Sequence, residues 1–218
     1  MGVITDHLDL WGEALLGTLK LFAGGGVLAL VLGIVVGAMR VSPVPIARAV
    51  GTFYVNTIRN TPLTLVFFGF ASALPPLIGV RASGGNEVLF AIGALGIYTA
   101  TYVAETIRSG INTVPVGQAE AARAIGLSFG QVMTLVVLPQ AFRSVIPPMM
   151  SVFIALLKNT TVAAGFAVMN LGSMRDWLSE QGENQLLVIV WVMIIFVALV
   201  MLLSWAQRTV EKRWTVAR

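Results

Sequence analysis

Three charged side chains lie inside or at the end of long apolar stretches, where a charge requires a counter-ion, water or a ligand. Lys158 lies within one such stretch, and Glu105 and Arg108 lie at the end of another. Charged groups at membrane depth are costly and usually face a bundle interior or a water-filled cavity. An ammonium group there can bind a substrate carboxylate. The candidates for a substrate pathway are these three residues and the polar residues Asn159, Thr160, Thr161, Arg59, Asn60 and Thr61.

The role of Lys158 has two interpretations. A helix that begins near Pro147 would carry Lys158 about 16 Å along its axis, close to half the thickness of a hydrocarbon core. The ammonium group could then meet a substrate carboxylate. Alternatively, it could form an internal ion pair or bind free backbone carbonyls, and so fix the packing of the helix.

The other charged candidates have structural alternatives of the same kind. Glu105 and Arg108 are three residues apart and therefore lie on one helical face. They could gate a pathway, but an ion pair at the membrane interface is the favoured interpretation. Arg59 lies shortly before Pro62, which suits a first helical turn, and could anchor the start of that helix.

The residue types exclude several kinds of chemistry. The chain has no cysteine, so it has neither a disulfide framework nor a thiolate metal site, and its one histidine, His7, lies close to the N-terminus. No apolar stretch contains a nucleophile–base set or a cluster of metal ligands, so we assign no catalytic or metal-binding residue. No lysine follows a glycine, so the phosphate-binding Gly-x-x-x-x-Gly-Lys-Ser/Thr loop is absent and we expect no cofactor. Basic residues occur singly between apolar blocks, which argues against a nucleic-acid partner.

The elements that position these residues are membrane-spanning helices. Hydrophobic residues make up 57% of the 218 positions and charged residues only 11%, whereas about a quarter of the residues of soluble domains are charged. A bilayer-spanning helix needs about 20 apolar residues, and five stretches qualify. We predict an all-α membrane protein with a single domain over residues 1–218 and transmembrane helices at about 14–39, 52–80, 86–108, 145–169 and 185–208. Gly33 and Gly37 have the small-x-x-x-small spacing that permits close helix packing.

Lysine and arginine are distributed unevenly between alternate connections. One side has only Arg81 and Arg175. The other side has Arg40, Arg48, Arg59, Arg108, Arg123, Arg143, Arg208, Lys212, Arg213 and Arg218. Because cytoplasmic loops carry the excess of basic residues, we predict the N-terminus outside and the C-terminus in the cytoplasm.

The longest connection, between the third and fourth stretches, lies on the predicted cytoplasmic side and contains an alanine-rich run. Pro115 suits a first helical turn, and Gly126 can end the helix in a left-handed conformation. We therefore predict a short helix over about 117–126, with Glu120 and Arg123 exposed. It could be a docking element for a cytoplasmic partner or an amphipathic helix on the membrane surface, and the residues alone favour neither.

Several blocks of this sequence resemble a known family. Glu120-Ala121-Ala122, Gly126 and Leu138-Pro139 have the residues and spacing of the EAA signature of ABC importer permeases, although Val136 stands where isoleucine is common. Arg59-Asn60-Thr61-Pro62-Leu63, Ala104 to Ile111 and Leu157 to Thr161 resemble further blocks of the polar amino-acid permeases. The resemblance covers about Gly17 to Trp214 and is nearest to glutamate importers of actinobacterial type.

The resemblance implies a type I ABC importer (MetI-like) permease fold in the plasma membrane of a bacterial cell. It also implies the partners: a dimer of cytoplasmic ATPase subunits, a second permease subunit that is identical or related, and an extracellular substrate-binding protein, besides the lipid bilayer. ATP would be bound by the ATPase alone, so this chain would be a transport subunit and not an enzyme.

The resemblance also implies roles for individual residues. Glu120, Ala121, Ala122, Arg123 and Gly126 would couple the closure of the ATPase to alternating access, with small alanines for close approach. The substrate would be a polar amino acid, with glutamate first and glutamine, aspartate, arginine and histidine as alternatives. Permeases for cationic amino acids share a lysine like Lys158, so the structural role of this residue is favoured. A secondary transporter is the rival class, but it usually has internal repeats and several intramembrane charges, which are not evident here.

Overall fold

The computed structural model describes residues 2–81 and 84–214, with side chains up to Thr209, and these residues form helices joined by short connections. Arg218, used above for orientation, lies outside the described residues, as do the side chains of Lys212 and Arg213. The long helices are α2 (Leu8–Val41), α6 (Asn86–Asn112), α9 (Leu138–Asn159) and α11 (Gln185–Trp214). The short helices are α1 (Gly2–Thr5), α3 (Pro45–Arg59), α4 (Leu63–Phe67), α5 (Leu74–Leu77), α7 (Val116–Ala124), α8 (Phe129–Gln131) and α10 (Met174–Glu180). Segments η1 (Phe68–Ala73) and η2 (Val132–Val137) are π-helical, and η3 (Thr160–Phe166) and η4 (Leu171–Ser173) are 3₁₀-helical.

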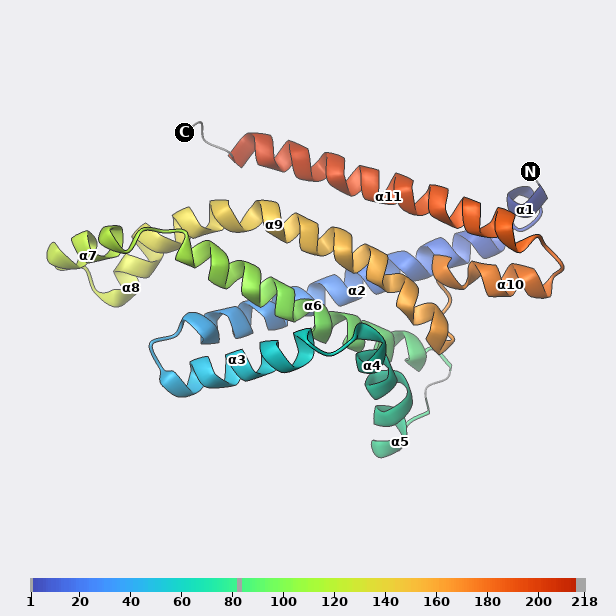
Figure 1. Ribbon diagram of the computed structural model, residues 1–218, viewed down its shortest axis with the longest axis horizontal. Helices are drawn as coiled ribbons and strands as arrows, with labels where there is room; N and C mark the ends of the chain where they lie inside the picture. Colours follow the sequence, from blue (N-terminus) through green and yellow to red (C-terminus); the bar gives the residue numbers. More distant parts are fainter. Residues whose placement is uncertain (1, 82–83, 215–218) are drawn as a thin grey trace.

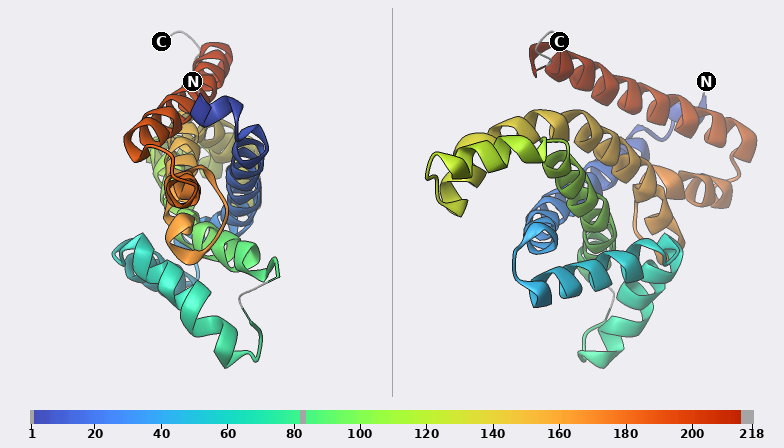
Figure 2. Two further views of the ribbon diagram at one scale, coloured as in Figure 1. Left: turned by 90° about the vertical axis from the view of Figure 1, so that its right-hand side faces the viewer. Right: turned by 60° about the vertical axis from the view of Figure 1, so that its left-hand side comes forward.

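The helices form an elongated bundle in which α2, α6 and α9 occupy the centre. Helix α11 lies on one side of these three, and α3 to α5 lie on the other side (Figures 1 and 2). Helix α1 and the C-terminal end of α11 lie at opposite ends of the bundle (Figure 1). The hairpin formed by α7 and α8 lies at the end away from α1 (Figure 1).

Helices α2 and α6 run parallel and pack closely along a seam of glycines. A Cβ atom built on Gly33 would lie 2.4 Å from Cγ1 of Val103, and one built on Gly37 would lie 3.2 Å from Cβ of Ile107. Gly33 contacts Val103 and Gly37 contacts Ile107, so both helices run in the same direction along the seam. The close packing that the spacing of Gly33 and Gly37 predicts is therefore confirmed.

The prediction of one helix over 52–80 is wrong. Helix α3 already ends at Arg59, and a separate apolar helical segment runs over 63–77. Pro62 lacks an N–H group and disfavours helical backbone at Thr61, which explains the interruption. The described residues therefore contain four helices that are long and apolar enough to cross a membrane, together with the shorter apolar segment.

The predicted fourth helix, 145–169, is wrong at both ends. Helix α9 begins at Leu138, and its α-helical part ends at Asn159. The π-helical turn Val132–Val137 directly precedes Pro139 of α9, and a π-helical turn also precedes the prolines of α5. A proline ring crowds the preceding turn and offers no N–H, and the wider π-helical turn accommodates both defects. The chain is thus helical well before Pro147.

The remaining helices differ from the predictions at their ends only. Helix α2 begins before residue 14, α6 and α11 continue past residues 108 and 208, and α7 covers 116–124 instead of 117–126.

Gly17 of α2 lies against the backbone that follows η3. A Cβ atom here would lie 2.0 Å from the carbonyl oxygen of Met169, and the neighbouring Thr18 Oγ1 accepts a hydrogen bond of 2.9 Å from the Leu171 amide. Backbone atoms cannot turn aside as a flexible side chain can. We therefore expect Gly17→Ala to lower the free energy of unfolding by about 1–3 kcal/mol.

Gly12→Ala is the matched control, because Gly12 lies in the same helix and nothing lies within 4 Å of its Cβ position. Alanine favours a helix over glycine, so this variant should be as stable as the parent or more stable. Thermal unfolding midpoints of both variants in the same detergent test the expectation. Equal midpoints would contradict the close contact at Gly17.

Candidate functional site

Gly126 ends α7 and turns the chain into α8. The amide of Leu127 donates to the carbonyl of Ala122 at 3.2 Å, and the amide of Gly126 donates to that of Arg123 at 2.9 Å. Together these bonds form a Schellman motif. Gly126 has φ +89°, a left-handed conformation that favours glycine, although the space around it is open. The predicted role of Gly126 as a helix terminator is confirmed.

The inner face of the α7–α8 hairpin has a small core of its own. Ala122 is 7% exposed and packs with the buried side chains of Val132 and Val137. Gln140 Nε2 of α9 also donates a 2.6 Å hydrogen bond to Gln118 Oε1 of α7. The hairpin is therefore held as a unit at the start of α9.

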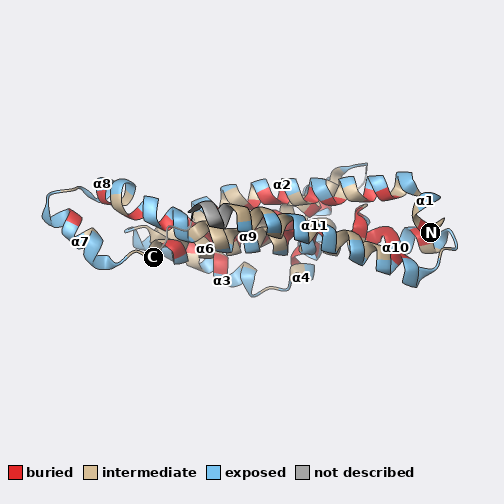
Figure 3. Cartoon of the chain, turned by 90° about the horizontal axis from the view of Figure 1, so that it is seen from above, coloured by how far each residue is buried: buried red, intermediate tan, exposed pale blue. Residues whose placement is uncertain are grey.

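The outer face of α7 has no partner among the described residues. Glu120, Ala121 and Arg123 are exposed, and the apolar side chains of Val116 and Ile125 are 72% and 80% exposed. Figure 3 shows α7 as almost entirely exposed, apart from its inner side. The two alanines of the Glu120-Ala121-Ala122 motif thus face different ways: Ala122 packs inside the hairpin, and Ala121 lies on its exposed surface.

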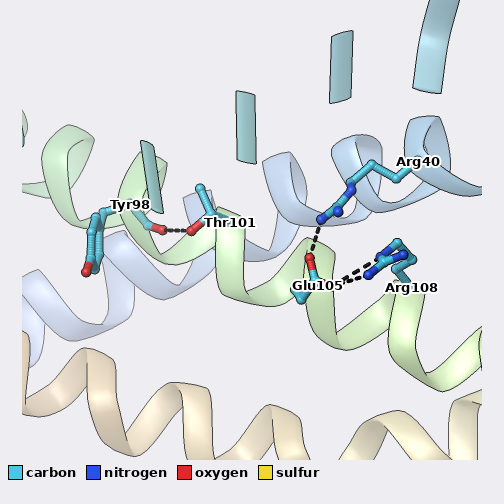
Figure 4. Close-up of polar contacts among 5 residues, drawn as sticks. All are labelled: Arg40, Tyr98, Thr101, Glu105 and Arg108. Carbon is cyan, nitrogen blue, oxygen red and sulfur yellow. Dashed lines mark hydrogen bonds and ion pairs between the residues drawn. The ribbon is translucent and has the colours of Figure 1, made fainter. Parts of the chain in front are cut away.

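A three-membered charged cluster joins α2 to α6 at the same end of the bundle. Arg40 donates a hydrogen bond to one carboxylate oxygen of Glu105, and Arg108 donates one of 2.7 Å to the other, so both arginines form ion pairs with Glu105 (Figure 4). The side chain of Arg40 is 7% exposed, that of Glu105 26% and that of Arg108 40%. The favoured interpretation of Glu105 and Arg108 as an ion pair is therefore confirmed. Sequence reasoning missed Arg40, although the seam at Gly37, one turn earlier, brings it beside α6.

A cavity of about 390 Å³, with several polar side chains in its lining, lies between α6 and α9. Tyr98 and Tyr102 line it with their hydroxyl oxygens 3.0 Å apart, and Asn159 lines it from α9. The guanidinium carbon of Arg59 lies 5.1 Å from the centre of the Tyr102 ring. Thr99 Oγ1 in the same lining is buried and has no hydrogen-bond partner among the described residues. This cavity can therefore hydrogen-bond a polar ligand, and the missed signal was the spacing of the two tyrosines.

Lys158 lies on a different face of α9, in an apolar groove against α11. Thr161 lines this groove with it, and the α11 side of the groove includes Val192, Phe196 and Val197. These α11 residues lie near the middle of its apolar length. Lys158 takes no part in the ion pairs found among the described residues.

The remaining candidates do not meet at one place. Thr160 is buried and donates to the carbonyl of Leu157 at 2.7 Å, and Thr161 donates to that of Lys158 at 2.8 Å. Asn60 and Thr61 lie in the turn between α3 and α4. The structure thus places Asn159 in the lining of the Tyr98–Tyr102 cavity and Arg59 over the Tyr102 ring, and it leaves Lys158 elsewhere.

Long apolar helices, a cavity with polar groups at depth, and an exposed hairpin at one end together define a membrane-embedded permease. The chain belongs to the family described as binding-protein-dependent transport system inner membrane component, whose pattern matches residues 29–216. It is therefore a permease of the ABC importers, and these permeases work with an ATPase and a substrate-binding protein. It is a multi-pass protein of the bacterial plasma membrane.

Individual proteins support this membership. The chain is 41% identical over 180 residues to the glutamate transport system permease protein GluC of Corynebacterium glutamicum, with 79% of each chain covered. It is 36% identical to the probable glutamine ABC transporter permease protein GlnM of Bacillus subtilis, with 95% of this chain and 92% of the relative covered. A crystal structure of an amino acid ABC transporter with histidines superposes with a TM-score of 0.89 at 25% identity, covering 96% of both chains. The resemblance and the all-helical MetI-like fold expected from the sequence are confirmed.

The charged cluster predicts unequal effects of removing its members. Glu105→Ala leaves the buried Arg40 without its counter-ion, which should cost about 3–5 kcal/mol of stability. Arg108→Ala removes a more exposed partner and should cost about 0–1 kcal/mol. Thermal unfolding in detergent measures both. The double variant Arg40→Met/Glu105→Leu, which removes both buried charges, should recover most of the loss. Equal losses for the two single variants would show that Arg40 is not the residue that depends on Glu105.

Proposed function

We propose that this permease moves a polar amino acid, with glutamate as the first choice, into the cytoplasm by alternating access driven by a separate ATPase dimer. The observation that carries the proposal is the unpartnered outer face of α7, presented on a hairpin that is stabilised by its own core. A docking surface of this kind can receive motion from a partner protein and pass it on without deforming.

The transmission follows from the contacts of the hairpin. Glu120 and Arg123 offer polar contacts to the ATPase, and Ala121 lets its surface approach closely. Ala122 fixes the hairpin from inside, and Gly126 sets its turn. Because the hairpin is bonded to the start of α9, closure of the ATPase moves α9, which carries polar side chains at its far end. The two accessible states then differ in the position of that end.

The topology of the proposal has five crossings. Helices α3 and α4–α5 together form the second one, interrupted at Asn60–Pro62. Its support is packing along α6: Tyr54 of α3 donates a 2.7 Å hydrogen bond to the Ile97 carbonyl, and Phe67 of α4 packs with Leu95. Helix α1 and the C-terminal end of α11 lie at opposite ends of the bundle, as an odd number of crossings requires (Figure 1). We assign the α7 end to the cytoplasm, because it carries the basic residues Arg40, Arg48, Arg108, Arg123 and Arg143. Arg59 lies further along the bundle, beside Tyr102.

The choice of glutamate rests on charge and on relatedness. Arg59 and Lys158 form no ion pair among the described residues, whereas Glu105 already has two cationic partners. Arg59, which lies over the Tyr102 ring, suits a substrate with an additional carboxylate, whereas Lys158 lies in a separate apolar groove and does not bear on the charge of the substrate. The 41% identical relative is named as a glutamate transport permease. Glutamine is the second candidate, because the relative that covers 95% of this chain is named for glutamine and the tyrosine hydroxyls suit an amide.

A single chain does not enclose a pathway, because the Tyr98–Tyr102 cavity and the Lys158 groove are both open hollows. We therefore propose a second permease subunit, identical or related, and an extracellular substrate-binding protein that delivers the amino acid. Secondary transport is disfavoured, because the coupling carboxylate it would need is Glu105, which is already paired.

Variants of α7 test the coupling role. We expect Glu120→Lys and Gly126→Asp to abolish uptake and substrate-stimulated ATP hydrolysis in the reconstituted importer, because the first reverses a contact charge and the second strains the left-handed turn. Both proteins should still insert, since neither residue lies in the bundle core. Gly117→Ala is the control: Gly117 lies in the same helix, its Cβ position is open and its φ is not positive. Full uptake by both test variants would remove the coupling role.

Competition tests the substrate. Proteoliposomes that contain the complete importer should take up labelled glutamate, and unlabelled glutamate should suppress this uptake most strongly. Glutamine and aspartate should compete more weakly, because each lacks either the second carboxylate or the full chain length. Competition by arginine or histidine alone would reject the proposed substrate and leave the coupling mechanism intact.

A further inference from the structure

A second polar hollow lies where the chain leaves the bundle at the α7 end. It has a volume of about 370 Å³ and lies among the end of α2, the α2–α3 turn, the end of α6 and the start of α8. Three arginines line it: Arg40, Arg48 and Arg108. The carboxylate bonded to two of them, Glu105, supplies one compensating charge. The hollow therefore has an excess of positive charge.

Each guanidinium in this hollow has donors to spare. Arg48 Nη1 donates to the carbonyls of Ser42 and Pro43 at 2.8 and 3.0 Å, which fixes the side chain over the α2–α3 turn. Arg108 uses Nε and Nη2 on Glu105. Arg40 is nine-tenths buried, and its Nε has no hydrogen-bond partner among the described residues. Since a guanidinium has five N–H donors, several remain available for an acceptor with many oxygens.

We propose that this hollow binds the phosphate group of an anionic phospholipid of the cytoplasmic leaflet. The arginines match a phosphate, whose oxygens accept charge-assisted hydrogen bonds from guanidinium groups. The inference rests on the topology of the proposed function, which places the α7 end in the cytoplasm. Anionic headgroups at that surface are attracted by basic residues at the ends of spanning helices.

The wall of the hollow favours a lipid over a soluble anion. Val41, Ile111 and Phe129 line it beside the arginines, and Phe129 is 51% exposed. Arg40 directly follows the apolar length of α2, so its guanidinium lies where a hydrocarbon core gives way to headgroups. Apolar groups beside a phosphate site suit a ligand with acyl chains attached close to its phosphate, which inorganic phosphate lacks.

A lipid bound here would connect the parts that must move together. It would touch the α2–α3 turn through Arg48, the end of α6 through Arg108 and the first residue of α8 through Phe129. The α7–α8 hairpin would then be braced against the bundle by a headgroup as well as by its own core. Lipid binding and the α7 coupling motion are therefore linked through α8.

The experiment measures lipid retained by the assembled importer in detergent, with phosphatidylglycerol and phosphatidylcholine offered at equal amounts. Native mass spectrometry counts the bound molecules. We expect preference for phosphatidylglycerol, and a fall of about tenfold in its affinity for Arg48→Gln, since one charge-assisted contact is lost. Arg143→Gln is the matched control: Arg143 is exposed on α9 at the same end of the bundle and does not line the hollow.

The outcomes distinguish a specific lipid site from non-specific lipid retention and from a site for a soluble anion. Equal retention of both lipids, or equal loss with Arg48→Gln and Arg143→Gln, would overturn the site. Displacement of phosphatidylglycerol by millimolar inorganic phosphate would show a soluble anion as the ligand and overturn the assignment to a lipid. Selective retention that depends on Arg48 and resists phosphate supports the proposal. Retention needs no transport, so a failure of the proposed function in uptake assays would be distinguishable from a failure here.

Discussion

The structure depends on one steric constraint, the close approach of α2 and α6 along their glycines. In a bilayer, lipid tails are as apolar as the side chains, so helices associate through close van der Waals packing rather than through hydrophobic burial. Because Gly33 and Gly37 have no side chains, Val103 and Ile107 of α6 pack directly against the α2 backbone, and the register that results places Arg40 beside Glu105. The ion pair then has a geometry that neither helix could set alone. With α6 fixed on this side, its other faces are available to α4 and to the cavity shared with α9.

The hairpin is organised on a different principle, because it lies outside the bundle and has no helix seam to hold it. Its rigidity comes from a few local bonds: the Schellman motif at Gly126, the buried Ala122 and the amide contact between Gln118 and Gln140. These bonds leave the opposite face of α7 unsatisfied. A hairpin that is stabilised by its own contacts and has one exposed face can dock against another protein without refolding. Its inner face provides the rigidity, and its outer face is available for recognition.

The sequence predicts some of these features because they are local. Long apolar stretches define α2, α6 and α11, and Gly126 marks the end of α7, since glycine suits a left-handed residue. Predictions failed where a proline acts through its neighbours. Pro62 interrupts a helix, whereas Pro139 follows a π-helical turn that no single residue encodes, and the chain continues as a helix through it. The ion pair between Arg40 and Glu105 could not be predicted from the sequence, because it depends on the register between two helices that are far apart in the chain. The sequence could have predicted that Lys158 and Asn159 face different neighbours, since consecutive residues of a helix point about 100° apart.

The different directions of Lys158 and Asn159 bear on how α9 works. Its first turns are tied to the hairpin, while Asn159 faces the cavity on α6 and Lys158 faces α11. Directly after these residues the α-helix tightens into the 3₁₀ segment that begins at Thr160. A continuous α-helix transmits displacement along its axis, and 3₁₀ turns commonly mark a change of direction or a hinge. Helix α9 therefore combines a long α-helical part, which includes Pro147 and Pro148, with a 3₁₀ end, and Lys158 and Asn159 lie at the boundary between the two. A small axial or rotational movement imposed at the hairpin would change the surroundings of both polar groups at once, one against each neighbouring helix.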